Sequence, residues 1–178
     1  MFEKSIWGFF MLLAMTVLMA ACTSESNEET NEKSDDNAKK YAKVFEETDS
    51  IAHDFMVVKI EQNYPEILNY LSLNGIDELK EDREYLLKKH RLPEEFEKLD
   101  GMYELRRYDN FYEEESGEVY YRYRTPDNKG SLVNSWIVLI KDEDKVWKVR
   151  SYFDSRPEMI DDNNAETGTV LHEFPEND

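Results

Sequence analysis

Residues 118–141 read EVYYRYRTPDNKGSLVNSWIVLIK, and their pattern decides the fold. Two runs rich in Tyr, Val, Ile and Trp flank a turn of Pro, Asp, Asn, Lys and Gly. Because so short a connection joins antiparallel neighbours, the stretch predicts a β-hairpin with strands at 118–125 and 131–141. Similar runs at about 102–113 and 145–153 extend the hairpin to a four-stranded antiparallel meander.

The residues that precede these strands have helical spacing. Between 39 and 62, apolar residues recur three, four and seven positions apart, which predicts one long amphipathic helix. Pro65 ends that helix and opens a second, short one, which Asn74-Gly75 closes. A third helical stretch follows to about His90. Helices followed by a curved antiparallel sheet predict an α+β domain in which the helices pack on the sheet.

This layout resembles the cone-shaped nuclear transport factor 2-like and cystatin-like folds. The resemblance covers roughly residues 38–153 and rests on the long first helix, the short helix at 65–72, and a closing strand, VWKVRSYF, at 146–153. It implies a cone-like α+β domain, versions of which occur as bacterial surface lipoproteins. It also introduces an enzymatic alternative, because cone-fold enzymes such as ketosteroid isomerases place a carboxylate base and Tyr donors at the mouth of the cone.

The amino-terminal segment ends in Met19-Ala20-Ala21-Cys22, and Cys22 is the only cysteine of the chain. Residues 6–21 carry no charge, but this run is shorter than the roughly 20 residues that a membrane-spanning helix needs. The stretch resembles the lipobox of bacterial lipoproteins. The resemblance implies a signal peptide at 1–21, cleavage between Ala21 and Cys22, and a diacylglycerol on Cys22. Such a protein is held by lipid on the extracytoplasmic face of the cell membrane. An uncleaved membrane anchor is the alternative.

The formal net charge of −18 lies mostly at the two ends of the chain. Residues 23–37 hold six acids and one Lys, and residues 154–178 hold eight acids and one Arg. We therefore expect an acidic disordered tether at 22–37 and an acidic, mostly disordered tail at 154–178, with Leu171 and Phe174 as its docking points. Because affinity for nucleic acid comes largely from neutralising phosphates, nucleic acid is excluded as a partner.

No pattern in the sequence predicts catalysis, a cofactor or a metal. The three histidines have no ligand-type neighbours at the spacing of a metal site. Strand alternation puts Tyr121 and Tyr123 on one face. Together with Trp136 they are interpreted either as the lining of a ligand cavity under the helices or as plain core.

Four basic side chains alternate onto the opposite face and predict a basic patch: Arg122, Arg124, Lys148 and Arg150. One interpretation is a seat for an anionic partner, such as a wall polymer or an acidic protein. The alternative is that the patch is neutralised within the chain, by cover from the acidic tail or by cross-strand pairing with Glu104, Glu113 and Glu118.

These observations predict a lipid-anchored surface lipoprotein that is a non-enzymatic ligand- or protein-binding module of unknown specificity. Two alternatives stay open: a cone-fold enzyme acting on a small apolar substrate, and an accessory subunit of an envelope complex. An Asp, Glu or His that faces a deep cavity beside Tyr121 or Tyr123 would favour the enzyme.

Overall fold

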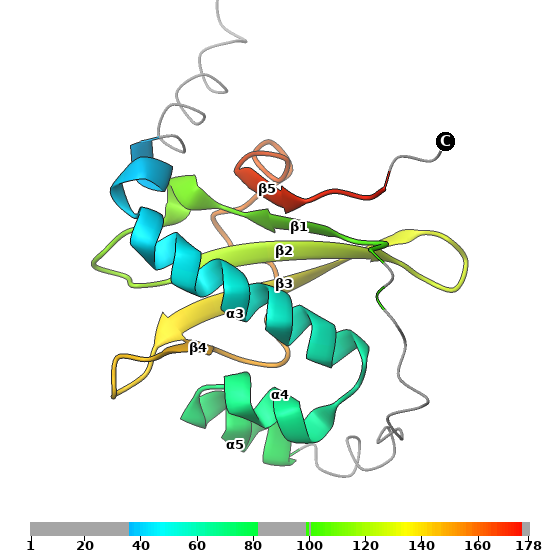
Figure 1. Cartoon of the computed structure of the whole chain (residues 1–178), viewed down its shortest axis with the longest axis horizontal. Coiled ribbons are helices and arrows are strands. Elements are labelled where there is room, and N and C mark those ends of the chain that lie inside the picture. The colour runs from blue at the N-terminus through cyan, green and yellow to red at the C-terminus, as the bar shows by residue number, and fades with distance from the viewer. Residues whose placement is uncertain (1–35, 82–98, 100, 176–178) are drawn as a thin grey trace, which may run out of the picture.

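The computed structural model describes residues 36–81, 99 and 101–175 and has the predicted α+β order of helices before an antiparallel sheet. Figure 1 shows the helices and strands of this part of the chain, in which residues 36–40 are also helical. The helices are α3 (Ala42–Ile60), α4 (Tyr64–Tyr70) and α5 (Leu73–Glu81). The strands are β1 (Glu104–Arg107), β2 (Val119–Pro126), β3 (Leu132–Lys141), β4 (Trp147–Val149) and β5 (Thr169–His172), and the 3₁₀-helix η2 is Asp109–Phe111.

The sheet has the strand order β4-β3-β2-β1-β5, with every neighbouring pair antiparallel. The first four strands form the predicted meander, but the predicted number of four strands is wrong. The fifth strand comes from the tail, which the sequence predicts to be mostly disordered. That prediction is wrong for residues 154–175, because Thr169–His172 pairs with β1 along an otherwise open edge.

The central hairpin lies close to its predicted bounds, whereas the outer strands are shorter than predicted. Val119 pairs with Leu139 at one end of the hairpin, and Pro126 pairs with Leu132 at the other. Strand β4 stops at Val149 instead of reaching residue 153. The chain leaves the sheet there because the carboxylate of Asp154, rather than a further strand residue, accepts the N–H of Val138 at 3.1 Å.

The two faces of the sheet are covered by different parts of the chain. Helix α3 crosses one face, and residues 150–168 run from the β4 edge to the β1 edge across the other (Figure 1). Buried residues on the helix side form the larger core, which includes Phe45, Phe55, Ile137 and Leu139. A second cluster lies beneath the tail and consists of Tyr108, Tyr120, Trp136, Val138 and Ile160.

The ends of the short helices follow from local backbone features, and one of these ends differs from the prediction. Helix α4 ends at Leu71, where the backbone becomes extended, and not at Asn74-Gly75. Gly75 lies inside α5, where a Cβ atom would come within 2.6 Å of the carbonyl oxygen of Arg150. This glycine therefore permits close packing of α5 rather than ending a helix.

Several sequence predictions fall wholly or partly outside the described residues. These are the signal peptide at 1–21, the lipobox with Ala21 and Cys22, most of the tether, and the third helix as far as His90. The tether's last two residues are described and are helical, and Asn37 donates hydrogen bonds to the carbonyl oxygens of Asp109 and Tyr112 at 2.8 and 3.2 Å. Asn37 thus belongs to the folded domain.

The docking of β5 can be tested at Gly168, which has a φ of 90° and whose Cβ would collide with the carbonyl oxygen of Arg107. Gly130 is a matched control, because it has a φ of 78° but open space around its Cβ position. We expect Gly130→Ala to lower the free energy of unfolding in urea by about 1–2 kcal/mol, the cost of a left-handed alanine. Gly168→Ala should cost more and should expose β5 to proteolysis. Equal losses in the two variants would contradict the observed seat of β5.

Candidate functional site

The predicted tyrosines share the helix-facing side of the sheet and are both buried in the core. Tyr121 is 0% exposed and Tyr123 is 4% exposed. The Tyr121 hydroxyl lies 2.6 Å from Oγ1 of Thr48 and 2.8 Å from Oδ1 of Asp49, both on α3. Burial raises the pKa of both phenols. Both side chains pack within the main hydrophobic core, so the geometry favours core over a ligand cavity.

Asp49 is a carboxylate beside Tyr121 that the strand pattern did not reveal, because it comes from the facing helix. Its side chain is 27% exposed and forms an ion pair with Arg107 at 2.5 Å. Arg107 also forms an ion pair with Asp109, which is fully buried. Burial raises the pKa of Asp49, and the positive charge of Arg107 opposes that rise. The carboxylate is therefore held in a structural network and does not face a described cavity.

Trp136 lies on the opposite face from the two tyrosines, so its predicted place in their cavity is wrong. The hairpin register pairs Tyr121 with Ile137 and Arg122 with Trp136. Residues directly opposite each other share a face, which puts Ile137 in the helix-side core and Trp136 under the tail. There its ring stacks on Tyr108 with the ring centroids 5.6 Å apart.

The arginines of β2 do point away from the helices, but they do not form an exposed patch. Arg122 is only 2% exposed, and its guanidinium contacts Glu104 at 2.8 Å and Glu166 at 2.9 Å. Arg124 contacts the same Glu166 at 2.5 Å. Arg106, opposite Arg122 on β1, contacts Glu104 at 3.3 Å. We call this group of Arg106, Arg122, Arg124 and Glu104 the arginine clamp.

The arginine clamp holds the main chain of the tail as well as one acidic side chain. The carbonyl oxygen of Ala165 accepts hydrogen bonds from Arg122 and from the Tyr108 hydroxyl, both at 2.7 Å. The carbonyl oxygen of Glu166 accepts one from Arg106 at 2.5 Å. Charge-assisted bonds of this kind are roughly twice as strong as neutral ones. The clamp therefore fixes residues 165–167 immediately before β5.

The other two predicted patch residues lie outside the arginine clamp. Lys148 donates to the carbonyl oxygen of Asn69 at 2.8 Å. Arg150 contacts Asp154 at 2.9 Å and Glu118 at 3.4 Å. The predicted patch is thus divided, and its arginines are neutralised by acidic residues of the sheet and of the tail.

The pKa of Glu104 in the clamp and that of Glu166 in the tail are both lowered. The hydrogen bond from Arg122 is the main reason that the pKa of Glu166 is lowered. Burial would raise the pKa of Glu104, but the hydrogen bond from Arg122 and the charges of Arg106 and Arg124 outweigh it and lower that pKa. Both side chains are therefore ionised acceptors at neutral pH.

A surface pocket of about 370 Å³ lies where the end of α3 meets the tip of the central hairpin. It is lined by Lys59, Ile60, Gln62, Leu99, Met102, Thr125 and Pro126. The Lys59 ammonium donates to the carbonyl oxygen of Tyr152 at 2.6 Å and lies 4.5 Å from the centre of that ring. Burial lowers the pKa of Lys59 to about 8. This amine therefore ties the segment after β4 to α3.

The two described histidines have structural contacts and do not approach a metal site. His53 lies 3.2 Å from the Tyr103 hydroxyl, and His172 stacks on the Tyr103 ring with centroids 3.8 Å apart. Within the part of the chain that the structure describes, no three His, Cys, Asp or Glu side chains gather closely enough to hold a metal ion. Within the same residues, no helix is long and apolar enough to cross a membrane.

Comparisons of the chain with protein-family models, with curated proteins and with solved structures found no match.

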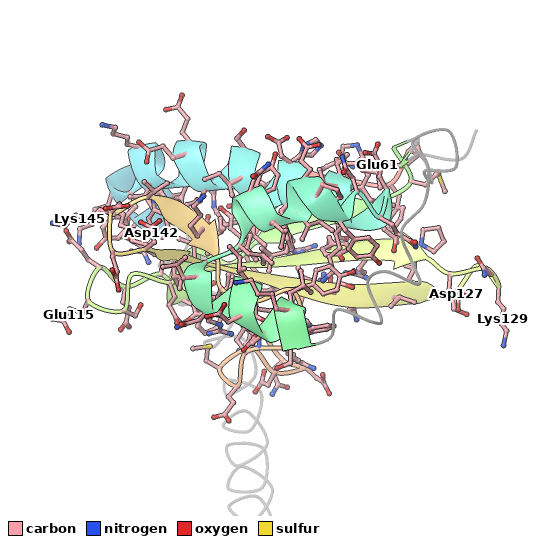
Figure 2. All side chains as sticks on the ribbon, turned by 90° about the horizontal axis from the view of Figure 1, so that it is seen from below. Glu61, Glu115, Asp127, Lys129, Asp142 and Lys145 are labelled. Atoms are coloured by element: carbon pink, nitrogen blue, oxygen red, sulfur yellow. The ribbon has the colours of Figure 1, made fainter. Side chains whose placement is uncertain are left out.

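The clamp predicts a large effect of Glu104→Gln, because this variant removes a negative charge that faces a buried guanidinium. Breaking a buried ion pair costs about 3–5 kcal/mol. Because Arg122 keeps its ion pair with Glu166, we expect a loss in unfolding free energy near the lower end of this range, at about 3 kcal/mol. Glu115→Gln is the control, since Glu115 projects into solvent from a turn (Figure 2) and should change stability by less than about 0.5 kcal/mol. Urea unfolding of both variants measures this, and similar losses would contradict the role given to Glu104.

Lys59 predicts a stability change at alkaline pH. Its pKa is about 8 in the folded chain against an ordinary value of 10.5, so the unfolded chain holds the extra proton between these two values. Stability that depends on Lys59 therefore rises with pH across that window. The difference in unfolding free energy between wild type and Lys59→Met should shift in favour of wild type from pH 8 to 10.5. Lys129→Met, at the exposed hairpin tip in Figure 2, should show no such shift. A flat difference for Lys59→Met would contradict the buried amine.

Proposed function

We propose that this chain is a lipid-anchored protein of the extracytoplasmic face of the cell membrane and acts there as a non-enzymatic binding module. The anchor is supported by the lipobox-like Met19-Ala20-Ala21-Cys22 at the end of an uncharged apolar run. Two acyl chains on Cys22 would give stable attachment, because each buried CH₂ contributes about 0.8 kcal/mol.

One observation carries the binding part of the proposal, namely the way in which the arginine clamp holds a turn with an acidic side chain immediately before β5. Arg106 and Arg122 bind consecutive main-chain carbonyls, and Arg122 and Arg124 bind the Glu166 carboxylate. Main-chain bonds combined with one charged side chain are a common means of recognising an extended peptide. We propose a protein partner on this ground.

The enzymatic alternative has one specific observation in its favour, which is the contact between Asp49 and the Tyr121 hydroxyl at 2.8 Å. A carboxylate with a raised pKa beside a phenol resembles the acid–base pairs of cone-fold enzymes. Pairing of Asp49 with Arg107 and full burial of Tyr121 support a structural role instead. The helix-on-sheet layout is also what supports membership of the cone-shaped folds. An accessory role in an envelope complex is compatible with the same anchor.

The anchor is tested by Cys22→Ala in the intact chain. We expect this variant to lose incorporation of a labelled fatty acid, and to leave the membrane fraction or accumulate with its signal peptide uncleaved. Thr30→Ala, in the same acidic segment, should label and fractionate like wild type. Mass spectrometry of the mature amino terminus provides the second readout. A Cys22→Ala chain that is processed and retained like wild type would refute lipid anchoring.

A further inference from the structure

The tail segment in the arginine clamp makes contacts that a separate peptide could also make. Its contacts with the clamp use the carbonyl oxygens of Ala165, Glu166 and Thr167 and one carboxylate, that of Glu166. After these residues, β5 pairs with β1 as a bound peptide adds a strand to a sheet edge. Recognition thus uses the carbonyl oxygens of a turn, an acidic side chain and a short strand.

The tail is held at two places, at Ile160 and at the arginine clamp with β5. Ile160 is 1% exposed and fills the cluster around Trp136, and the Arg156 guanidinium donates to the carbonyl oxygen of Ile160. By contrast, the Glu166 side chain is 63% exposed, and all four residues of β5 are only partly buried. Local opening of residues 165–172 would leave Ile160 holding the rest of the tail in place.

The chain's own tail does not satisfy the arginine clamp completely. Three guanidinium groups contact two carboxylates, those of Glu104 and Glu166, which leaves one positive charge in excess. The Nε atoms of Arg122 and Arg124 are buried and have no hydrogen-bond partner among the described residues. A buried donor without a partner costs about 1–3 kcal/mol. A segment with a further acidic group would match the charge of this site better.

We propose that the arginine clamp and the edge of β1 form a peptide-binding site for an acidic segment of a partner protein, with an acidic turn followed by a strand, which displaces residues 165–172 of the tail. The inference gives the partner class of the binding module proposed above and rests on that proposal. The tail is then a competitor within the chain that keeps the clamp covered until a better-matched segment arrives. The apparent affinity for the partner segment is the affinity of the open clamp multiplied by the fraction of chains whose clamp is open.

A fluorescent synthetic peptide with the sequence of residues 163–175 is a suitable probe. It is titrated into the intact lipoprotein in detergent and followed by fluorescence anisotropy. We compare wild type with Glu166→Gln, which weakens the tail's hold on the clamp, and with Glu173→Gln, an acid-to-amide change in the tail outside the described clamp contacts. The peptide should bind Glu166→Gln at least about tenfold more tightly than it binds the other two chains, because the competing tail is released more often.

The same change made in the peptide should have the opposite effect. A probe in which Glu166 is replaced by Gln should bind the Glu166→Gln chain about tenfold more weakly, and added salt should weaken the unaltered probe. A Glu166→Gln chain that unfolds normally but binds no probe would overturn the proposal. Equal affinity for all three chains would place the probe elsewhere and would also overturn it.

Two further outcomes distinguish this inference from a tail-exchanged dimer and from the proposed lipid anchor. If the intact chain forms dimers through tail exchange, its mass in solution rises with concentration, and the occupant is a second copy rather than a partner segment, which contradicts the proposal. Because the titration is done in detergent solution, it does not depend on Cys22. Failure of lipid anchoring and failure of peptide binding are therefore distinguishable.

Discussion

The structure depends most on the need to neutralise a guanidinium buried inside a β-sheet. Arg122 lies on the second strand with 2% of its surface exposed, and a charge in such a place is tolerated only with paired carboxylates and hydrogen bonds. Glu104 comes from the neighbouring strand, but Glu166 comes from 44 residues further along the chain. The carboxyl-terminal tail is therefore part of the fold, because it completes the environment of this arginine.

The same requirement explains how the two sides of the sheet differ. On the helix side, burial of apolar side chains such as Phe55 and Ile137 does most of the stabilising, as in ordinary helix-on-sheet packing. On the tail side the apolar cluster around Ile160 is small, and charged hydrogen bonds fix the segment that follows it. Contacts of this second kind are weakened by salt and acid and can be reproduced by another acidic segment. The tail side is therefore the face that we propose for binding.

The helices and the central hairpin could be predicted from the sequence because their signals are local. Periodicity gave the bounds of α3 to within a few residues, and the turn at 126–130 gave the hairpin. The alternation of Tyr121 against Arg122 also gave their opposite faces. Trp136 was placed on the wrong face because its side depends on the register across the turn, and a shift of one residue reverses every side chain.

The sequence offered neutralisation of the patch by Glu104 or by the acidic tail as one alternative, but the seat of Glu166 and the fifth strand could not be predicted, since both depend on contacts distant in sequence. The run Thr169-Val170-Leu171 has strand-forming residues but is short and lies in an acidic segment, so composition pointed to disorder. The excess of arginine on one face of the sheet indicated only that acidic residues elsewhere in the chain neutralise it. Asp49 was overlooked for a similar reason, because a helix residue reaches Tyr121 across the core.

Amide hydrogen exchange of the intact chain, followed by mass spectrometry, tests the central claim most directly. If the arginine clamp makes the tail part of the fold, the amides of residues 165–172 exchange far more slowly than those of an unstructured peptide. Their protection should fall with added salt, while that of β2 and β3 stays nearly constant. Exchange of residues 165–172 at the unstructured rate, with the sheet protected, would contradict the account.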